Sequence, residues 1–237
     1  MMEARLNRAT WVVKGGVNLR AWFGSRRYSE DLDLDALGSA PHVLREKFDT
    51  ILLGRPLEDL LTSQGLEVVR IAKPKQTDTT QRWKLELKAA GFSVPLHTKV
   101  EFSRRGTRGE EYVLEPARSD IVRPYGIPVP TVSHYTARSA IRQKIAALAG
   151  RSETQARDIW DLDHLLRSTD ADPRPLSQSV REALPGALER AISLGYDVFK
   201  AQVVPYLPED DQSIYGTRDA WERMRELVVE RLEEFGS

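Results

Sequence analysis

Three aspartates alternate with two leucines in the sequence Asp31-Leu32-Asp33-Leu34-Asp35. A β-strand places alternate side chains on opposite faces, so this spacing predicts a strand with all three carboxylates on one face. Carboxylates this close repel one another unless a cation neutralises them. Mg²⁺ is suited to that role, because it prefers hard oxygen ligands. The segment therefore predicts a strand at which a divalent metal ion binds.

The composition excludes several kinds of site. The chain has 237 residues, enough for one large or two small domains, and 41% of them are hydrophobic, which allows a sizeable core. The absence of cysteine removes disulfides, thiolate metal sites and cysteine nucleophiles. The four histidines are scattered, so we expect any metal to be held by carboxylates. No apolar run approaches the roughly 20 residues of a membrane span and no signal-peptide core is present, so we expect a cytoplasmic protein without membrane contact.

Hydrophobic periodicity predicts a mixed first half and a helical second half. The predicted strands cover 11–14, 26–36, 66–72, 82–89 and 94–103. The predicted helices cover 17–23, 41–53, 56–64, 137–149, 154–167, 176–194 and 219–234. A segment with three prolines and a glycine, 123–135, indicates a linker. We therefore predict an α+β fold, with a mixed β-sheet domain at 1–125 and a mainly helical domain at 126–237.

The residues before the aspartates suggest nucleotide chemistry. The pair Gly15-Gly16 precedes a predicted helix, where backbone N–H groups can approach phosphates closely. Two cations, Arg26 and Arg27, follow that helix. A solvated acidic edge strand explains the aspartates alone about equally well. Phosphate-binding glycines, cations and carboxylates together favour a nucleotide site.

This arrangement resembles the first motif of the AbiEii/AbiGii toxins, nucleotidyltransferase-like proteins of the polymerase-β-like superfamily. That motif is K-G-G, a helix, then R-x-S-x-D-x-D, and the chain has KGG at 14–16 and RYSEDLD at 27–33. The resemblance implies that Asp31 and Asp33 are catalytic metal ligands. The nucleotide-binding residues that it implies are Lys14, Gly15, Gly16, Arg27, Ser29 and Lys144. Asp35 is additional to the motif and is a lesser candidate.

A third carboxylate is expected on a later strand. The family often has a K-h-E-h segment there, h being apolar, and the chain has KVEF at 99–102. The resemblance therefore implies Glu101 as the third catalytic and metal-binding carboxylate, with Glu86 as the competing candidate. An ordinary amphipathic strand accounts for the same alternation without any function.

A later motif of the family, K-h-x-A-L followed by R-D-h-x-D-L, resembles KIAAL at 144–148 and RDIWDL at 157–162. Lys144 falls at the edge of an apolar helical stripe, and the resemblance implies that it reaches the triphosphate. Asp158 is either a catalytic residue or a structural partner of Lys144 or Arg157, and a role for Asp161 stays open.

The resemblance implies a Mg²⁺-dependent nucleotidyltransferase, with Mn²⁺ as a substitute, that transfers a nucleoside monophosphate from a nucleoside triphosphate. It implies a toxin of an AbiE-like toxin–antitoxin pair, an RNA acceptor such as a tRNA 3′ end, and a cognate antitoxin of the winged-helix repressor type. The helical half is expected to contribute to the active-site cleft. Two alternatives are a transferase acting on a small molecule of the aminoglycoside type and an inactive nucleotide- or partner-binding module.

Overall fold

The structure is a computed structural model that describes residues 10–104 and 109–237. The chain divides into two compact units. Among the described residues, the first unit contains 10–17, 30–104 and 112–134, and the second contains 18–29, 109–111 and 135–237. The domains predicted at 1–125 and 126–237 stay a prediction.

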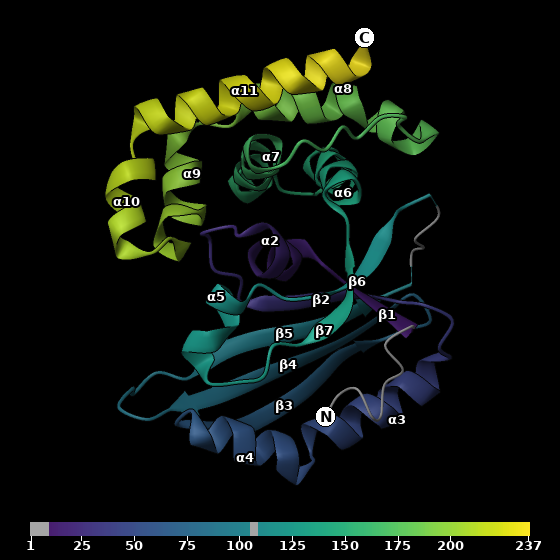
Figure 1. Cartoon of the computed structure of the whole chain (residues 1–237), viewed down its shortest axis with the longest axis vertical. Helices are drawn as coiled ribbons and strands as arrows, with labels where there is room; N and C mark the ends of the chain where they lie inside the picture. Colours follow the sequence, from purple (N-terminus) through teal and green to yellow (C-terminus); the bar gives the residue numbers. More distant parts are fainter. Residues whose placement is uncertain (1–9, 105–108) are drawn as a thin grey trace. The chain divides into compact units, whose positions relative to one another are not determined.

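A seven-stranded mixed sheet forms the first unit (Figure 1). Its strands are β1 (Trp11–Lys14), β2 (Asp31–Ala36), β3 (Leu66–Gln76), β4 (Thr80–Ala89), β5 (Leu96–Ser103), β6 (Tyr112–Pro116) and β7 (Thr131–Tyr135). The strand order is β3-β4-β5-β2-β1-β7-β6. β2 lies in the middle, antiparallel to β1 and parallel to β5. The alternation of leucine and aspartate thus predicts β2 correctly.

Two helices lie along β3 and β4 on the apolar side of this sheet, α3 (Pro41–Leu52) and α4 (Arg55–Ser63) (Figure 1). The ring of Phe48 on α3 packs edge-on against Trp83 and Phe102, with centroid distances of 4.7 and 5.2 Å. The Trp83 Nε1 group donates to Asp49 at 2.8 Å. This packing buries one sheet face and leaves the other face to the polar residues of each strand. Two short helices, α5 (Ser119–Val122) and η2 (Arg123–Tyr125), follow β6.

The second unit is helical. It contains α6 (Ala137–Gly150), α7 (Ala156–Ser168), α8 (Gln178–Ser193), α9 (Tyr196–Gln202), η3 (Val204–Tyr206), α10 (Glu209–Tyr215) and α11 (Arg218–Gly236). The helix α2 (Gly15–Phe23) belongs to this unit from Asn18 onward. Thr136, Ser177 and Thr217 each accept a hydrogen bond from the backbone N–H three residues on, which caps α6, α8 and α11. In Figure 1, α11 lies along α8, and these helices share one apolar core with α6, α7 and α9.

The α+β class, with a mixed sheet followed by helices, is confirmed. The predicted linker at 123–135 is wrong in its last part, because Thr131–Tyr135 is β7 and pairs in parallel with β1. The predicted strand 26–36 begins only at Asp31. The sequence patterns also missed β6, α9 and α10.

Candidate functional site

The carboxylates that the sequence singles out lie on neighbouring strands in the middle of the sheet. The register places Asp33 beside Lys14 of β1 and beside Glu101 of β5. Asp31 and Asp33 extend from the same face of β2, and their side chains are 35% and 34% exposed. The structure therefore brings Asp31, Asp33 and Glu101 to one accessible stretch of a single sheet face.

Two cations of the same unit neutralise these carboxylates. The Nζ atom of Lys99 lies 3.1 Å from Asp31 Oδ2 and 3.8 Å from Asp33 Oδ1. The Arg82 guanidinium donates to Glu101 Oε2 at 2.6 Å. The repulsion expected among the carboxylates is thus offset by protein side chains. The sequence alone does not identify Lys99 and Arg82 as the partners of these carboxylates, because the strand register brings them together. Arg82 lies opposite Glu101 in the β4–β5 pairing, and Lys99 lies opposite Asp31 in the β2–β5 pairing.

The carboxylate face has the donor chemistry for a divalent metal ion, since carboxylate oxygens are the hard ligands that Mg²⁺ prefers. Among residues 10–104 and 109–237, however, no group of three or more His, Cys, Asp or Glu side chains is arranged to hold a metal ion. The ion pairs with Lys99 and Arg82 occupy oxygens that a metal ion would need. The residues fit the metal in chemistry, and a metal ion would compete with these two cations for carboxylate oxygens.

The start of α2 lies against the carboxylate strand. Gly15 has a φ of +69°, and a Cβ at this position would lie 3.0 Å from Asp33 Oδ2. The left-handed backbone favours glycine here, and the Asp33 carboxylate leaves little room for a Cβ. The preceding Lys14 pairs with the buried Asp35 at 2.5 Å. Asp35 is thereby placed as the partner of Lys14, and the phosphate-binding roles of Lys14, Gly15 and Gly16 stay predictions.

A buried ionic network lies in the second unit between α6 and α7. Lys144 contacts Asp161 at 2.5 Å and Asp158 at 3.1 Å. Arg151 donates to Asp158 at 2.5 Å, and Arg27 reaches Asp161 at 3.3 Å. Both aspartate side chains are fully buried. Buried carboxylates require such partners, so these five residues form one connected ionic network.

Opposite charges decide the ionisation of this network. Burial by itself lowers the pKa of Lys144, but Asp161 and Asp158 outweigh it and the pKa lies above its ordinary value. Burial raises the pKa of Asp161, but Lys144 and Arg27 outweigh it and hold that pKa below its ordinary value. The network is therefore ionic at neutral pH.

The predicted site residues of the later motif acquire partners here. Asp158 pairs with Lys144, which is the structural alternative raised by the sequence. Arg151 and Asp161 join them, although the sequence patterns assigned neither a partner. The sequence does contain a signal for Asp161: it lies three residues after Asp158, which places both aspartates on one face of α7. Ser29 is partly exposed. The catalytic and nucleotide-binding roles predicted for Arg27, Ser29, Lys144 and Asp158 stay predictions.

Comparison with known proteins identifies relatives over most of the chain. Residues 2–234 match the family described as nucleotidyl transferase AbiEii toxin, type IV TA system. The fold is similar to the crystal structure of JHP933 from Helicobacter pylori, with a TM-score of 0.56, 18% identity, and coverage of 95% of this chain and 86% of that chain. A candidate nucleotidyltransferase from Helicobacter pylori gives the same TM-score and identity, with coverage of 95% and 88%. No curated protein matches the chain.

None of the helices in the described part of the chain is both long enough and apolar enough to span a membrane.

Proposed function

The chain belongs to the AbiEii family of nucleotidyltransferase toxins from type IV toxin–antitoxin systems, and we propose that Asp31, Asp33 and Glu101 are its reaction centre. The supporting observation is their register on one accessible sheet face, beside the glycine turn that starts α2. The proposed reaction transfers a nucleoside monophosphate from a nucleoside triphosphate to an acceptor hydroxyl. The bond between the α- and β-phosphates breaks, and pyrophosphate leaves.

Each group in the centre has a proposed task. Asp31, Asp33 and Glu101 would hold Mg²⁺, or Mn²⁺ in its place. An ion held by these carboxylates would supply activation of the attacking hydroxyl and charge neutralisation at the leaving pyrophosphate. The backbone N–H groups at Gly15 and Gly16 would bind phosphate at the start of α2, where the helix dipole favours an anion. Lys14, Arg27, Ser29 and Lys144 would add donors to phosphate oxygens, as the family motif implies.

The proposed acceptor is an RNA in the cytoplasm, such as a tRNA 3′ end. The segment from 138 to 157 carries five basic residues and one acidic residue. Arg142 donates to the carbonyls of Pro173 and Pro175, while Lys144 and Arg151 are bound in the buried network. Two candidates for phosphate contact are left in this segment, fewer than the sequence suggests: Arg157, and Arg138, whose 3.7 Å ion pair with Glu111 is exposed on both sides.

A labelling experiment separates the proposal from its two alternatives. The protein is incubated with α-³²P-labelled nucleoside triphosphates and, in parallel reactions, with total RNA, with an aminoglycoside, or alone. Label on RNA supports the proposed toxin activity. Label on the aminoglycoside indicates a small-molecule transferase. No transfer to RNA, aminoglycoside or the protein itself, with any of the four nucleotides, indicates the inactive binding module.

A toxin of this kind has a cognate antitoxin, and we propose one of the winged-helix repressor type.

Replacing Lys99 should make metal binding stronger. Its ammonium competes with the metal for Asp31 and Asp33, so Lys99→Met should tighten Mn²⁺ binding about 5-fold, as expected for a partly exposed ion pair. Isothermal titration with Mn²⁺ measures this directly. Lys84→Met is the matched control, because Lys84 is exposed and pairs with Lys99 across the β4–β5 register. Equal Mn²⁺ affinity of wild type and Lys99→Met would show that Lys99 does not compete with the metal.

Replacing Lys144 by methionine tests whether this buried lysine also serves the triphosphate. The variant keeps the aliphatic length and leaves two arginines facing two aspartates, so we expect it to fold with a loss of about 1–3 kcal/mol. A lost charge-assisted contact to phosphate should reduce kcat/KM for transfer by about 10- to 100-fold. Lys144→Arg should restore only part, because guanidinium and ammonium differ in geometry. A loss of activity no larger than the loss of folded protein, measured by thermal melting, would make Lys144 purely structural.

A further inference from the structure

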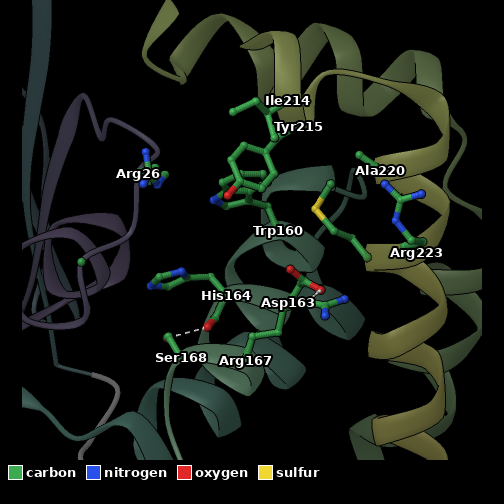
Figure 2. A pocket seen from close by; sticks show the side chains of 12 residues that line it. Arg26, Trp160, Asp163, His164, Arg167, Ser168, Ile214, Tyr215, Ala220 and Arg223 are labelled. Atoms are coloured by element: carbon green, nitrogen blue, oxygen red, sulfur yellow. Dashed lines mark hydrogen bonds and ion pairs between the residues drawn. The ribbon is translucent and has the colours of Figure 1, made fainter. Parts of the chain in front are cut away.

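A cavity of about 460 Å³ lies within the helical unit (Figure 2). Its walls come from α7, the end of α10, the first turns of α11 and the loop that follows α2. On α7 the lining residues include Trp160, His164 and Arg167, which the helical spacing places on one face. The volume is within the usual range for a site that binds a small molecule.

Cations dominate the charge of this cavity. Arg26 is held by two bonds to Asp211, at 2.7 and 3.0 Å, and Arg167 by Asp163 at 2.7 Å. Arg223 also lines the cavity and is exposed, and it forms none of the ion pairs recorded among the described residues. The exposed guanidinium of Arg223, which forms no ion pair within the described part of the chain, suits an anion with several oxygens.

Another wall of the cavity is uncharged and consists of aromatic and apolar side chains. The rings of Trp160 and Tyr215 meet edge to face with centroids 5.5 Å apart. Met224 and Ile214 also line the cavity, and Ile214 is 61% exposed. Figure 2 shows Tyr215 and Trp160 together in the middle of the view, with Arg26 to their left and Arg223 to their right. Trp160 is buried and stacked on Phe199, so it supports Tyr215 from behind. A planar ring can pack against the accessible Tyr215 and Ile214, while an attached anion meets the arginines.

We propose that this cavity binds a phosphorylated nucleoside, with the base against Tyr215 and Ile214 and the phosphate at Arg223. The site goes beyond the transfer reaction and is formed without Asp31, Asp33 or Glu101. The ligand is either a free mononucleotide or the terminal nucleotide of an RNA chain, since both present the same base and phosphate. Arg223 is the specific anchor, because Arg26 and Arg167 already have carboxylate partners.

Calorimetric titration with nucleoside monophosphates tests the site. AMP, GMP, CMP, UMP and inorganic phosphate are titrated separately into the full chain in EDTA, which suppresses metal-dependent binding. At least one mononucleotide should bind more tightly than phosphate, and Arg223→Ala should weaken it about 10- to 100-fold. Arg181→Ala removes an exposed arginine of α8 outside the cavity and should change nothing. No mononucleotide binding, or binding unaffected by Arg223→Ala, overturns the proposal.

Two further variants identify where and how the ligand binds. Tyr215→Leu should weaken the mononucleotide but not phosphate, provided that melting shows the variant folded; equal weakening of both would overturn the role of the ring. Asp33→Asn should leave mononucleotide binding unchanged, and a loss would assign the ligand to the carboxylate face instead. A single-stranded ribotetranucleotide separates the two sources of the ligand. Arg223-dependent binding tighter than that of the mononucleotide indicates a chain end, and weaker binding indicates a free nucleotide.

Discussion

Asp33→Asn and Asp31→Asn should each abolish nucleotide transfer while the protein stays folded. Each change removes an oxygen ligand and a negative charge from the proposed metal position, and such losses lower rates by about 1,000-fold or more. Both side chains are about one-third exposed and share Lys99 as a partner, so their loss should change stability by only about 1 kcal/mol or less. Transfer of labelled nucleotide and thermal melting measure the two effects.

The two candidates for the third carboxylate, Glu101 and Glu86, provide a test variant and its matched control. Glu101→Gln should reduce transfer severely, because Glu101 lies beside Asp33 in the register. Glu86→Gln changes the competing candidate, which faces His97 further along the β4–β5 pairing, and should leave transfer near the wild-type rate. A Glu86→Gln variant that is inactive beside an active Glu101→Gln would exchange their assignments. Wild-type transfer by Asp31→Asn or Asp33→Asn would remove the metal site from the carboxylate face altogether.

The central strand was predictable because its signal is local. Leucine and aspartate alternate within five residues, and the leucine at 34 is fully buried as this pattern requires. The predicted start at Arg26 failed because non-local contacts hold the preceding loop. Arg26 binds Asp211 and Arg27 binds Asp161, which lie 185 and 134 residues further along the chain. A prediction from local sequence patterns cannot detect these pairs, because the two residues of each pair are too far apart in the chain.

The strand β7 was hidden for a related reason. Its residues follow three prolines and include the polar residues Ser133 and His134, so the segment resembles a linker. In the structure both side chains are buried, and Val13 of β1 lies opposite His134 in a parallel pairing. A parallel partner more than a hundred residues away leaves no local pattern beyond the flanking valine and tyrosine.

The residue types at the carboxylate face were predictable, but their ionic partners were not. Asp31, Asp33 and Glu101 stand out by motif, whereas Lys99 and Arg82 are ordinary strand cations until the register aligns them. The same holds in the helical unit, where Arg151 lies in the basic stretch of the later motif but its bond to Asp158 is found only in the structure.

Asp161→Asn should destabilise the helical unit more than Lys144→Met does, although both residues belong to the same ionic network. Asp161 is fully buried and accepts from Lys144 and Arg27. Its loss leaves three cations, Arg27, Lys144 and Arg151, with one carboxylate. Removing one partner of a buried ion pair typically costs about 3–5 kcal/mol. For a chain of this size that loss lowers the melting temperature by about 6–20 °C. Lys144→Met should cost less, because it leaves two cations with two carboxylates.

The same helix provides the control for this prediction. Asp163 is also buried, but its partner Arg167 is largely exposed, so Asp163→Asn leaves a cation that water can solvate. The pKa of Asp161 is held below its ordinary value, so its contribution is present above about pH 4 and disappears as the pH falls through that depressed pKa. The stability difference between wild type and Asp161→Asn, measured by urea unfolding, should therefore be largest near neutral pH and shrink in acid. Equal losses from Asp161→Asn and Asp163→Asn at pH 7 would show that exposure of the stranded cation does not matter.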